Sequence, residues 1–201
     1  MSIAEKLQTV AQNQQRVYDA GRQAEYDAFW DVFQNKGEPT NYYYKFSYVG
    51  WNDENFNPKY PIICSNATTP GMALFYYNKE ITDTKVPITV LGSSAQAIFC
   101  GSQALVTIRE LTLNEKANLA SSFNECYALK NLTIAGVIGT SVDLHWSPLT
   151  KSSIESVFAV LSDTTTGTTA TFKKTAVDSA FTKDDWEGLV ASKTNWTIAL
   201  G

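Results

Sequence analysis

The chain has few of the side chains on which enzymes and metal centres depend. Its 201 residues include one histidine, His145, and three cysteines, Cys64, Cys100 and Cys126. Their wide separation provides neither a C-x-x-C pair nor the usual spacing of metal ligands. The motifs G-x-S-x-G, H-E-x-x-H and G-x-G-x-x-G and the P-loop do not occur. We therefore expect a protein that is not an enzyme and that binds no cofactor and no metal.

The sequence also lacks the features of membrane and nucleic-acid proteins. It has no run of about 18 apolar residues, and its first residues lack the basic and then apolar layout of a signal peptide. The 16 Lys and Arg residues are scattered and the net charge is −4, so no basic patch is predicted. An odd number of cysteines argues against a disulfide framework. We expect synthesis in a cytoplasm, with no membrane partner and no nucleic-acid partner.

Residues 1–35 predict one long helix with a heptad seam. The segment Gly37-Glu38-Pro39 ends this helix, because proline cannot continue it. The seam favours self-association, with Gln14 as a polar layer that fixes the register. The alternative is an amphipathic helix that packs on its own domain. The seam does not fix the number of strands, and a trimer is our working hypothesis. The seam positions are Ile3, Leu7, Val10, Gln14, Val17, Gly21, Ala24 and Ala28.

Residues 36–90 predict a connecting region that is rich in aromatic side chains. We expect strands at 42–48, 73–77 and 86–90, the last two as strands of degenerate coils. The aromatic side chains could form a platform for sugar, because ring faces pack on the C–H surfaces of sugars, or they could fill a small core or a subunit interface. Both interpretations are open at this stage. The rings between the helix and Tyr60 are Phe29, Trp30, Phe33, Tyr42, Tyr43, Tyr44, Phe46, Tyr48, Trp51, Phe56 and Tyr60.

Residues 91–201 begin with two copies of one pattern, 24 residues apart. A period of this size is typical of units that must stack on a neighbour to bury their apolar side chains. Alternation along each predicted strand places the apolar residues inside and short polar residues outside. The predicted core is Phe99, Leu105, Ile108, Leu111, Leu113, Phe123, Cys126, Leu129, Leu132 and Ile134. The predicted outer face, our candidate binding face, is Glu110, Thr112, Asn114, Asn131 and Thr133.

The end of the chain predicts an α/β cap that covers the open edge of the coils. Residues 152–162 and 184–193 have the apolar spacing of helices, and residues 169–173 and 197–200 that of strands. Ser152 and Glu155 have the spacing of a capping box at the start of the first helix.

The string Phe123-Asn-Glu-Cys126-Tyr-Ala-Leu129-Lys-Asn-Leu132-Thr-Ile134 resembles the leucine-rich repeats of the BspA-like class. In the first copy Ser102 stands in place of the cysteine, and we expect three extra residues to shift its strand. The resemblance implies a short, irregular solenoid. The fold class we predict is therefore α/β, with a coiled-coil-like N-terminal helix, a leucine-rich-repeat solenoid and an α/β C-terminal cap.

A second resemblance covers more of the chain. The phrases Ile3-Ala-Glu-Lys-Leu7, Val17-Tyr-Asp-Ala-Gly21, Tyr26-Asp-Ala-Phe-Trp30, Asn131-Leu-Thr-Ile-Ala-Gly136 and Lys193-Thr-Asn-Trp-Thr-Ile198 are similar to phage and prophage proteins of gut-type bacteria. It implies a structural protein of the virion, in the tail, baseplate or a fibre. The implied partners are further copies of the chain, other virion proteins and a bacterial surface receptor. The alternative is an adhesin-type module that binds a host glycan or protein.

Overall fold

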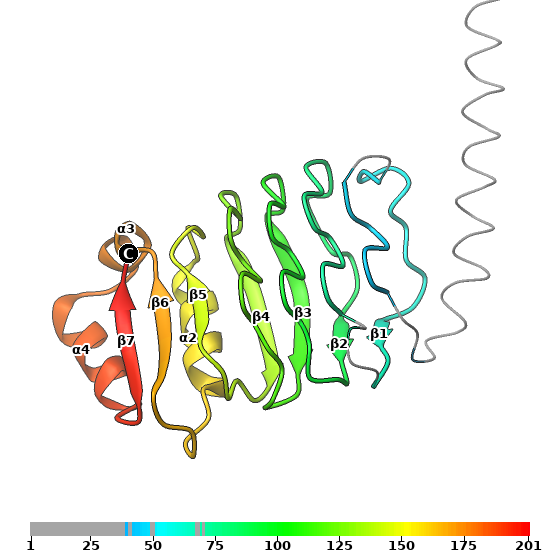
Figure 1. Ribbon diagram of the computed structural model, residues 1–201. Coiled ribbons are helices and arrows are strands. Elements are labelled where there is room, and N and C mark those ends of the chain that lie inside the picture. The colour runs from blue at the N-terminus through cyan, green and yellow to red at the C-terminus, as the bar shows by residue number, and fades with distance from the viewer. Residues whose placement is uncertain (1–38, 40–41, 49–50, 67–68, 70) are drawn as a thin grey trace, which may run out of the picture.

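The computed structural model describes residue 39 and residues 42–48, 51–66, 69 and 71–201 (Figure 1). Within these residues the protein is a mixed α/β fold with two small parallel sheets and three helices. The helix expected for residues 1–35, with all eight seam positions from Ile3 to Ala28, lies outside the described residues.

The first sheet contains four parallel strands in sequence order: β1 (Ile62–Cys64), β2 (Ile88–Val90), β3 (Thr107–Leu113) and β4 (Asn131–Gly136). Figure 1 shows these strands side by side, each joined to the next by a long loop on the same edge. One row of apolar residues crosses the sheet, because neighbouring strands pair Ile62 with Ile88, Ile88 with Leu111 and Leu111 with Ile134. All four residues of this row are buried.

The pairing of β3 with β4 contains one irregularity. Ile108 pairs with Leu132 and Leu111 pairs with Ile134, so β3 has one more residue than β4 over this interval. The extra residue forms a β-bulge, in which two residues of one strand oppose one of the other. The expectation of three extra residues is therefore wrong. The bulge absorbs the surplus inside the strand.

Four turns stack on one another beside the first sheet. Their central rings, Phe46, Phe75, Phe99 and Phe123, follow each other at centroid distances of 5.3, 5.4 and 5.9 Å. Backbone hydrogen bonds join the turns as well: the Phe75 N–H donates to the Ile98 carbonyl at 2.7 Å, and the Phe99 N–H to the Ser122 carbonyl at 3.0 Å. Neighbouring windings of the chain are thus connected through their turns as well as their strands.

The strands expected at 42–48 and 73–77 are wrong, since both segments form turns. Each contains two residues in the left-handed region, Tyr44 and Tyr48 in the first and Ala73 and Tyr77 in the second, with φ between 54° and 60°. A strand cannot include this conformation. The aromatic residues that led us to predict strands have other roles: some fill the core, and others cover the turns.

One side-chain hydrogen bond recurs between neighbouring turns. Asn78 Nδ2 donates to the Phe46 carbonyl at 2.9 Å, Ser102 Oγ to the Phe75 carbonyl at 2.8 Å, and Cys126 Sγ to the Phe99 carbonyl at 3.2 Å. All three donors are buried. The position requires a small donor rather than a cysteine, which explains why Ser102 can replace it. We call this series the donor ladder.

A second, separate sheet lies towards the C-terminus, and its arrows run opposite to those of the first sheet (Figure 1). It contains β5 (Val142–Leu144), β6 (Thr168–Phe172) and β7 (Trp196–Leu200), all parallel and in sequence order. Three helices accompany it: α2 (Lys151–Val160), α3 (Lys174–Ala180) and α4 (Lys183–Ala191). The expected cap elements are present within a few residues of their predicted bounds, and α3 is an addition that the sequence did not predict.

Helix α2 lies along the free edge of β4 and buries the face that the sequence predicted. Ile154, Val157 and Phe158 are buried there. The predicted capping box is wrong, because Thr150 rather than Ser152 is the N-cap and its side chain makes no capping hydrogen bond. Ser153 Oγ instead accepts from the Leu132 N–H at 2.9 Å and so ties the helix to β4.

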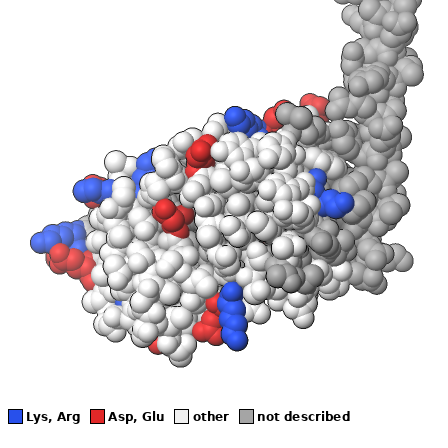
Figure 2. Space-filling view, in the orientation of Figure 1, with Lys and Arg blue, Asp and Glu red and all other residues white. Residues whose placement is uncertain are grey.

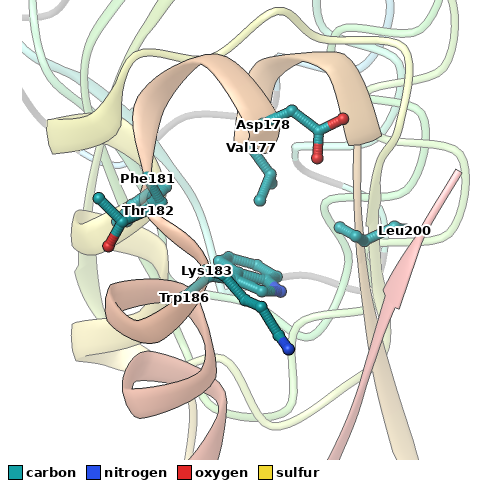
Figure 3. A pocket seen from close by; sticks show the side chains of 7 residues that line it. All are labelled: Val177, Asp178, Phe181, Thr182, Lys183, Trp186 and Leu200. Atoms are coloured by element: carbon teal, nitrogen blue, oxygen red, sulfur yellow. The ribbon is translucent and has the colours of Figure 1, made fainter.

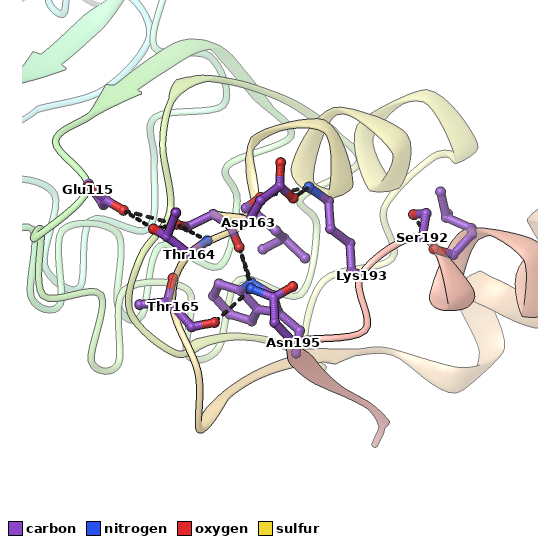
Figure 4. Close-up of polar contacts among 11 residues, drawn as sticks. Glu115, Asp163, Thr164, Thr165, Ser192, Lys193 and Asn195 are labelled. Atoms are coloured by element: carbon purple, nitrogen blue, oxygen red, sulfur yellow. Dashed lines mark hydrogen bonds and ion pairs between the residues drawn. The ribbon is translucent and has the colours of Figure 1, made fainter.

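The segment before β7 is fixed to the loop after α2 (Figure 4). Asn195 Nδ2 donates to the carbonyls of Ser162 and Thr165 at 2.8 and 2.7 Å, and Trp196 Nε1 donates to the Ser162 carbonyl at 2.8 Å. Lys193 Nζ donates to the Leu161 carbonyl at 2.7 Å. These three donors give the Lys193-Thr-Asn-Trp phrase a structural role, because they fix the start of β7 to the loop after α2.

Candidate functional site

The outer face of the first sheet holds the five residues predicted as a binding face. Asn131 and Thr133 are exposed on β4, Glu110 and Thr112 are half-buried on β3, and Asn114 is exposed just after β3. Their side chains bond mainly along the surface: Asn131 Nδ2 donates to Thr107 Oγ1 at 3.3 Å, and Thr112 Oγ1 donates to Glu110 Oε1 at 3.1 Å. The result is a level polar surface rather than a cleft.

An ion pair on the same sheet was not predicted. Arg109 lies in the bulge of β3 and donates through Nε and Nη2 to the two carboxylate oxygens of Asp83, at 3.0 and 2.5 Å. Asp83 raises the pKa of the Arg109 guanidinium through these bonds. The pairing depends on the bridge between Asp83 and Thr107, which no local sequence signal marks.

The ten residues predicted as repeat core all lie in the buried cluster of the protein. Cys126 and Cys64 belong to it, and burial raises the pKa of both thiols, that of Cys64 to about 12. A thiol reacts as the thiolate, so these side chains stay inert at neutral pH. His145 follows β5 and its Nδ1 lies 2.6 Å from Asp143 Oδ1. Among the described residues, no three His, Cys, Asp or Glu side chains are grouped as metal ligands would be.

A cluster of tyrosines covers the first two stacked turns, and we call it the tyrosine platform. Its rings approach one another at centroid distances from 4.4 to 6.4 Å. Of the two interpretations of the aromatic segment, the structure bears on burial alone: Tyr42, Phe46 and Phe56 are core, whereas Tyr43, Tyr44 and Tyr48 are exposed and Tyr76 and Tyr77 are half-buried. The members of the platform are Tyr43, Tyr44, Tyr48, Tyr76 and Tyr77.

Sequence reasoning missed how the platform is assembled. Tyr76 and Tyr77 come from the turn that was expected to be a strand, and Tyr43, Tyr44 and Tyr48 from the turn before it. The signal was present in the sequence as the pairs Phe46 and Tyr48, then Phe75 and Tyr77, which keep the same spacing within their turns.

The cap carries a surface hollow of about 310 Å³ between α3, α4 and β7 (Figure 3). Its apolar wall includes Val177, Phe181 and Trp186. The polar groups at its edge are engaged elsewhere: Asp178 binds Lys174 at 2.6 Å, and Thr182 Oγ1 accepts from the Asp185 N–H at 3.2 Å as the N-cap of α4. The hollow therefore offers apolar contact and no convergent polar groups.

Charged side chains do not gather into a field of one sign on the face shown in Figure 2, where basic and acidic residues stand singly or side by side. Of the helices that the structure describes, none combines the length and the apolar character that crossing a bilayer requires. No family model matches the chain, and no curated protein and no solved structure matches it.

Proposed function

We propose that the protein is a non-enzymatic structural component of a phage virion, in which a stacked-repeat domain presents the outer face of its first sheet to another protein. The observation that carries this proposal is the alternation on β3 and β4. Leu132 and Ile134 point into the core, while Asn131 and Thr133 between and beside them are exposed. Outer residues can therefore change without loss of the core, as a recognition scaffold requires.

We assign the first sheet and its turns to an irregular solenoid of leucine-rich-repeat type. Three observations support this assignment: the parallel strands in sequence order, the stacked phenylalanines and the donor ladder. The solenoid then begins before residue 91, because β1, β2 and the turns at Phe46 and Phe75 belong to it. Residues 142–200 are its α/β cap.

The place in a virion rests on the resemblance of the N-terminal and C-terminal phrases to phage proteins. In this proposal residues 1–35 assemble the oligomer, taken as a trimer, and attach it to the tail, baseplate or fibre. The repeat domain contacts a neighbouring virion protein or a bacterial receptor. Immunogold labelling of purified particles tests this role directly, and particles that carry no label would exclude it.

The sheet face has its own experiment. Asn131→Arg with Thr133→Arg changes two exposed side chains of β4 and leaves the buried positions intact. We expect this variant to fold with the melting temperature of the parent chain and to lose incorporation into particles. A matched change on the exposed side of α4, Asp184→Arg, should retain incorporation. Equal incorporation of both variants would exclude the sheet face as the contact.

A second candidate function is an adhesin-type module that acts outside any particle. The observation that favours it is the exposed tyrosine platform, which a purely internal subunit does not need. Binding of the intact chain to bacterial cells in a pull-down assay, together with its absence from purified particles, would select this function over the first.

A further inference from the structure

The tyrosine platform combines clustered aromatic rings with polar groups at its border. Tyr43, Tyr44 and Tyr48 are exposed by 43%, 39% and 53%, whereas every described phenylalanine except Phe181 is buried. An exposed cluster of large rings on a soluble fold marks a binding surface more often than chance exposure. The platform lies on stacked turns, away from the sheet face.

The rings of the platform are ordered rather than scattered. The plane of Tyr48 lies within 9° of that of Tyr44 and within 10° of that of Tyr77, at centroid distances of 6.4 Å in both cases. Tyr76 stands edge-on to Tyr44 and Tyr48, 5.7 Å from each. The planes of Tyr44, Tyr48 and Tyr77 are therefore nearly parallel, and the edge-on ring of Tyr76 packs against them, as aromatic pairs favour.

The next turn holds Tyr77 in place. Gly101 lies under this ring, and a Cβ at position 101 would approach Tyr77 Cγ and Cδ1 to 2.8 Å. Gly101 also has φ of 74°, in the left-handed region where glycine is favoured. The backbone of the third turn thus supports the ring from below. Because the Tyr77 ring is already held in place, a ligand that binds to it loses less free energy to the ordering of this side chain.

The border of the platform carries both signs of charge. Tyr48 and Tyr77 line a hollow of about 330 Å³ together with Lys79 and Glu80. Glu125, from a later turn, lies close enough to raise the pKa of the Tyr77 hydroxyl, and it accepts from Gln103 Nε2 at 3.2 Å. The Tyr77 hydroxyl therefore remains protonated at neutral pH and can both donate and accept. A border of one cation and two carboxylates gives no preference for a strongly charged ligand.

We propose that the tyrosine platform is a binding site for a neutral, linear carbohydrate chain, which lies across Tyr44, Tyr48 and Tyr77 and places a sugar ring in the hollow beside Lys79 and Glu80. The C–H face of a sugar is weakly positive and packs on the negative face of an aromatic ring. The hydroxyl groups of the sugar match the tyrosine hydroxyls, the ammonium group and the carboxylate. The row of parallel rings suits several linked sugars rather than one.

The experiment uses the intact chain and defined probes. Isothermal titration measures binding to neutral oligomers of glucose, mannose, galactose and N-acetylglucosamine, with heparin as a polyanionic control. We expect millimolar or tighter binding to at least one neutral oligomer, and weaker binding to heparin. Failure of all neutral oligomers to bind would overturn the proposal, as would preferential binding of heparin.

Matched variants locate the site. Tyr48→Ala removes the central ring and should weaken binding at least about tenfold, whereas Tyr127→Ala, at a tyrosine of comparable exposure (45%) outside the platform, should leave it unchanged. Tyr48→Phe retains the ring face and should keep most of the affinity. Equal losses for Tyr48→Ala and Tyr127→Ala would overturn the assignment to this surface.

Light scattering on the same variants separates a sugar site from a contact between protein segments. If Tyr48→Ala changes the mass of the assembly and no oligosaccharide binds, the platform is a subunit interface and the proposal is wrong. The result does not depend on the virion assignment, because the sheet face and the tyrosine platform are tested by different variants.

Discussion

Replacement of Leu132 by aspartate is the sharpest test of the interior of the first sheet. Leu132 is 2% exposed on β4, beside Ile108 of β3, and its N–H is held by Ser153 of α2. Truncation of a buried leucine to alanine costs about 2–5 kcal/mol. A buried carboxylate without a partner costs several kcal/mol more. A domain has only about 5–15 kcal/mol of stability in total, so we expect Leu132→Asp to unfold the region around β4.

Thr133→Asp is the control, one residue away on the exposed side of the same strand. Surface changes of this kind alter stability by about 0.5 kcal/mol or less. Leu132→Ala gives an intermediate point, with a melting temperature lowered by roughly 4–20 °C for a chain of this size. Circular dichroism during heating measures all three variants. Equal melting temperatures for Leu132→Asp and Thr133→Asp would refute the inside and outside assignment.

Three further predictions concern other parts of the molecule. Gly136→Ala should lower the stability by at least about 1–2 kcal/mol in urea unfolding, because Gly136 has φ of 82° and a Cβ there would lie 2.1 Å from the Leu113 carbonyl oxygen; an unchanged midpoint would contradict the close approach of β3 and β4. Burial raises the pKa of the Cys64 thiol from 9.0 to about 12, so the folded chain holds this proton more tightly than the unfolded chain does. The contribution of Cys64 to stability should therefore be complete below pH 9 and fall between pH 9 and about 12. Urea titrations should show a fall of about 1.4 kcal/mol per pH unit in the free energy of unfolding. The fall should be shallower in Cys64→Ala, and equal slopes would contradict the role of this thiol. Leu7→Asp with Val10→Asp should abolish oligomers in light scattering while leaving the melting transition of the repeat domain in place, and a parent chain that is already a monomer would refute the predicted seam.

The sequence predicted best where the side-chain pattern repeats at a constant period. Phe99 and Phe123 are equivalent in position and stack at 5.9 Å, and the helix face of Ile154, Val157 and Phe158 is buried as its spacing indicates. In both cases a regular spacing of apolar residues corresponds to a regular arrangement in the structure, and this spacing can be found in a single sequence.

Prediction failed where backbone conformation overrides composition. The segment around Tyr44 and Tyr77 has the composition of a strand, yet the stack of turns requires left-handed residues there, and tyrosine accepts them at an energetic cost that packing offsets. The surplus in β3 was predicted as three residues rather than one, because its size cannot be read until the register of the partner strand is known. The capping box failed for a related reason: Ser153 uses its hydroxyl to bind β4, and the helix begins at Lys151, so Ser152 is not the cap.

The donor ladder has a mechanical consequence. Each winding is bonded to its neighbours by strand pairing, by backbone hydrogen bonds between the turns, and by the side chain of Asn78, Ser102 or Cys126. A force that pulls the two chain ends apart therefore loads the outermost winding first, and the windings should detach in succession instead of giving way together. Phe75, Phe99 and Phe123 recur every 24 residues, so each detachment would lengthen the extended chain by about 80 Å. A fold of this kind should therefore yield in steps under tension.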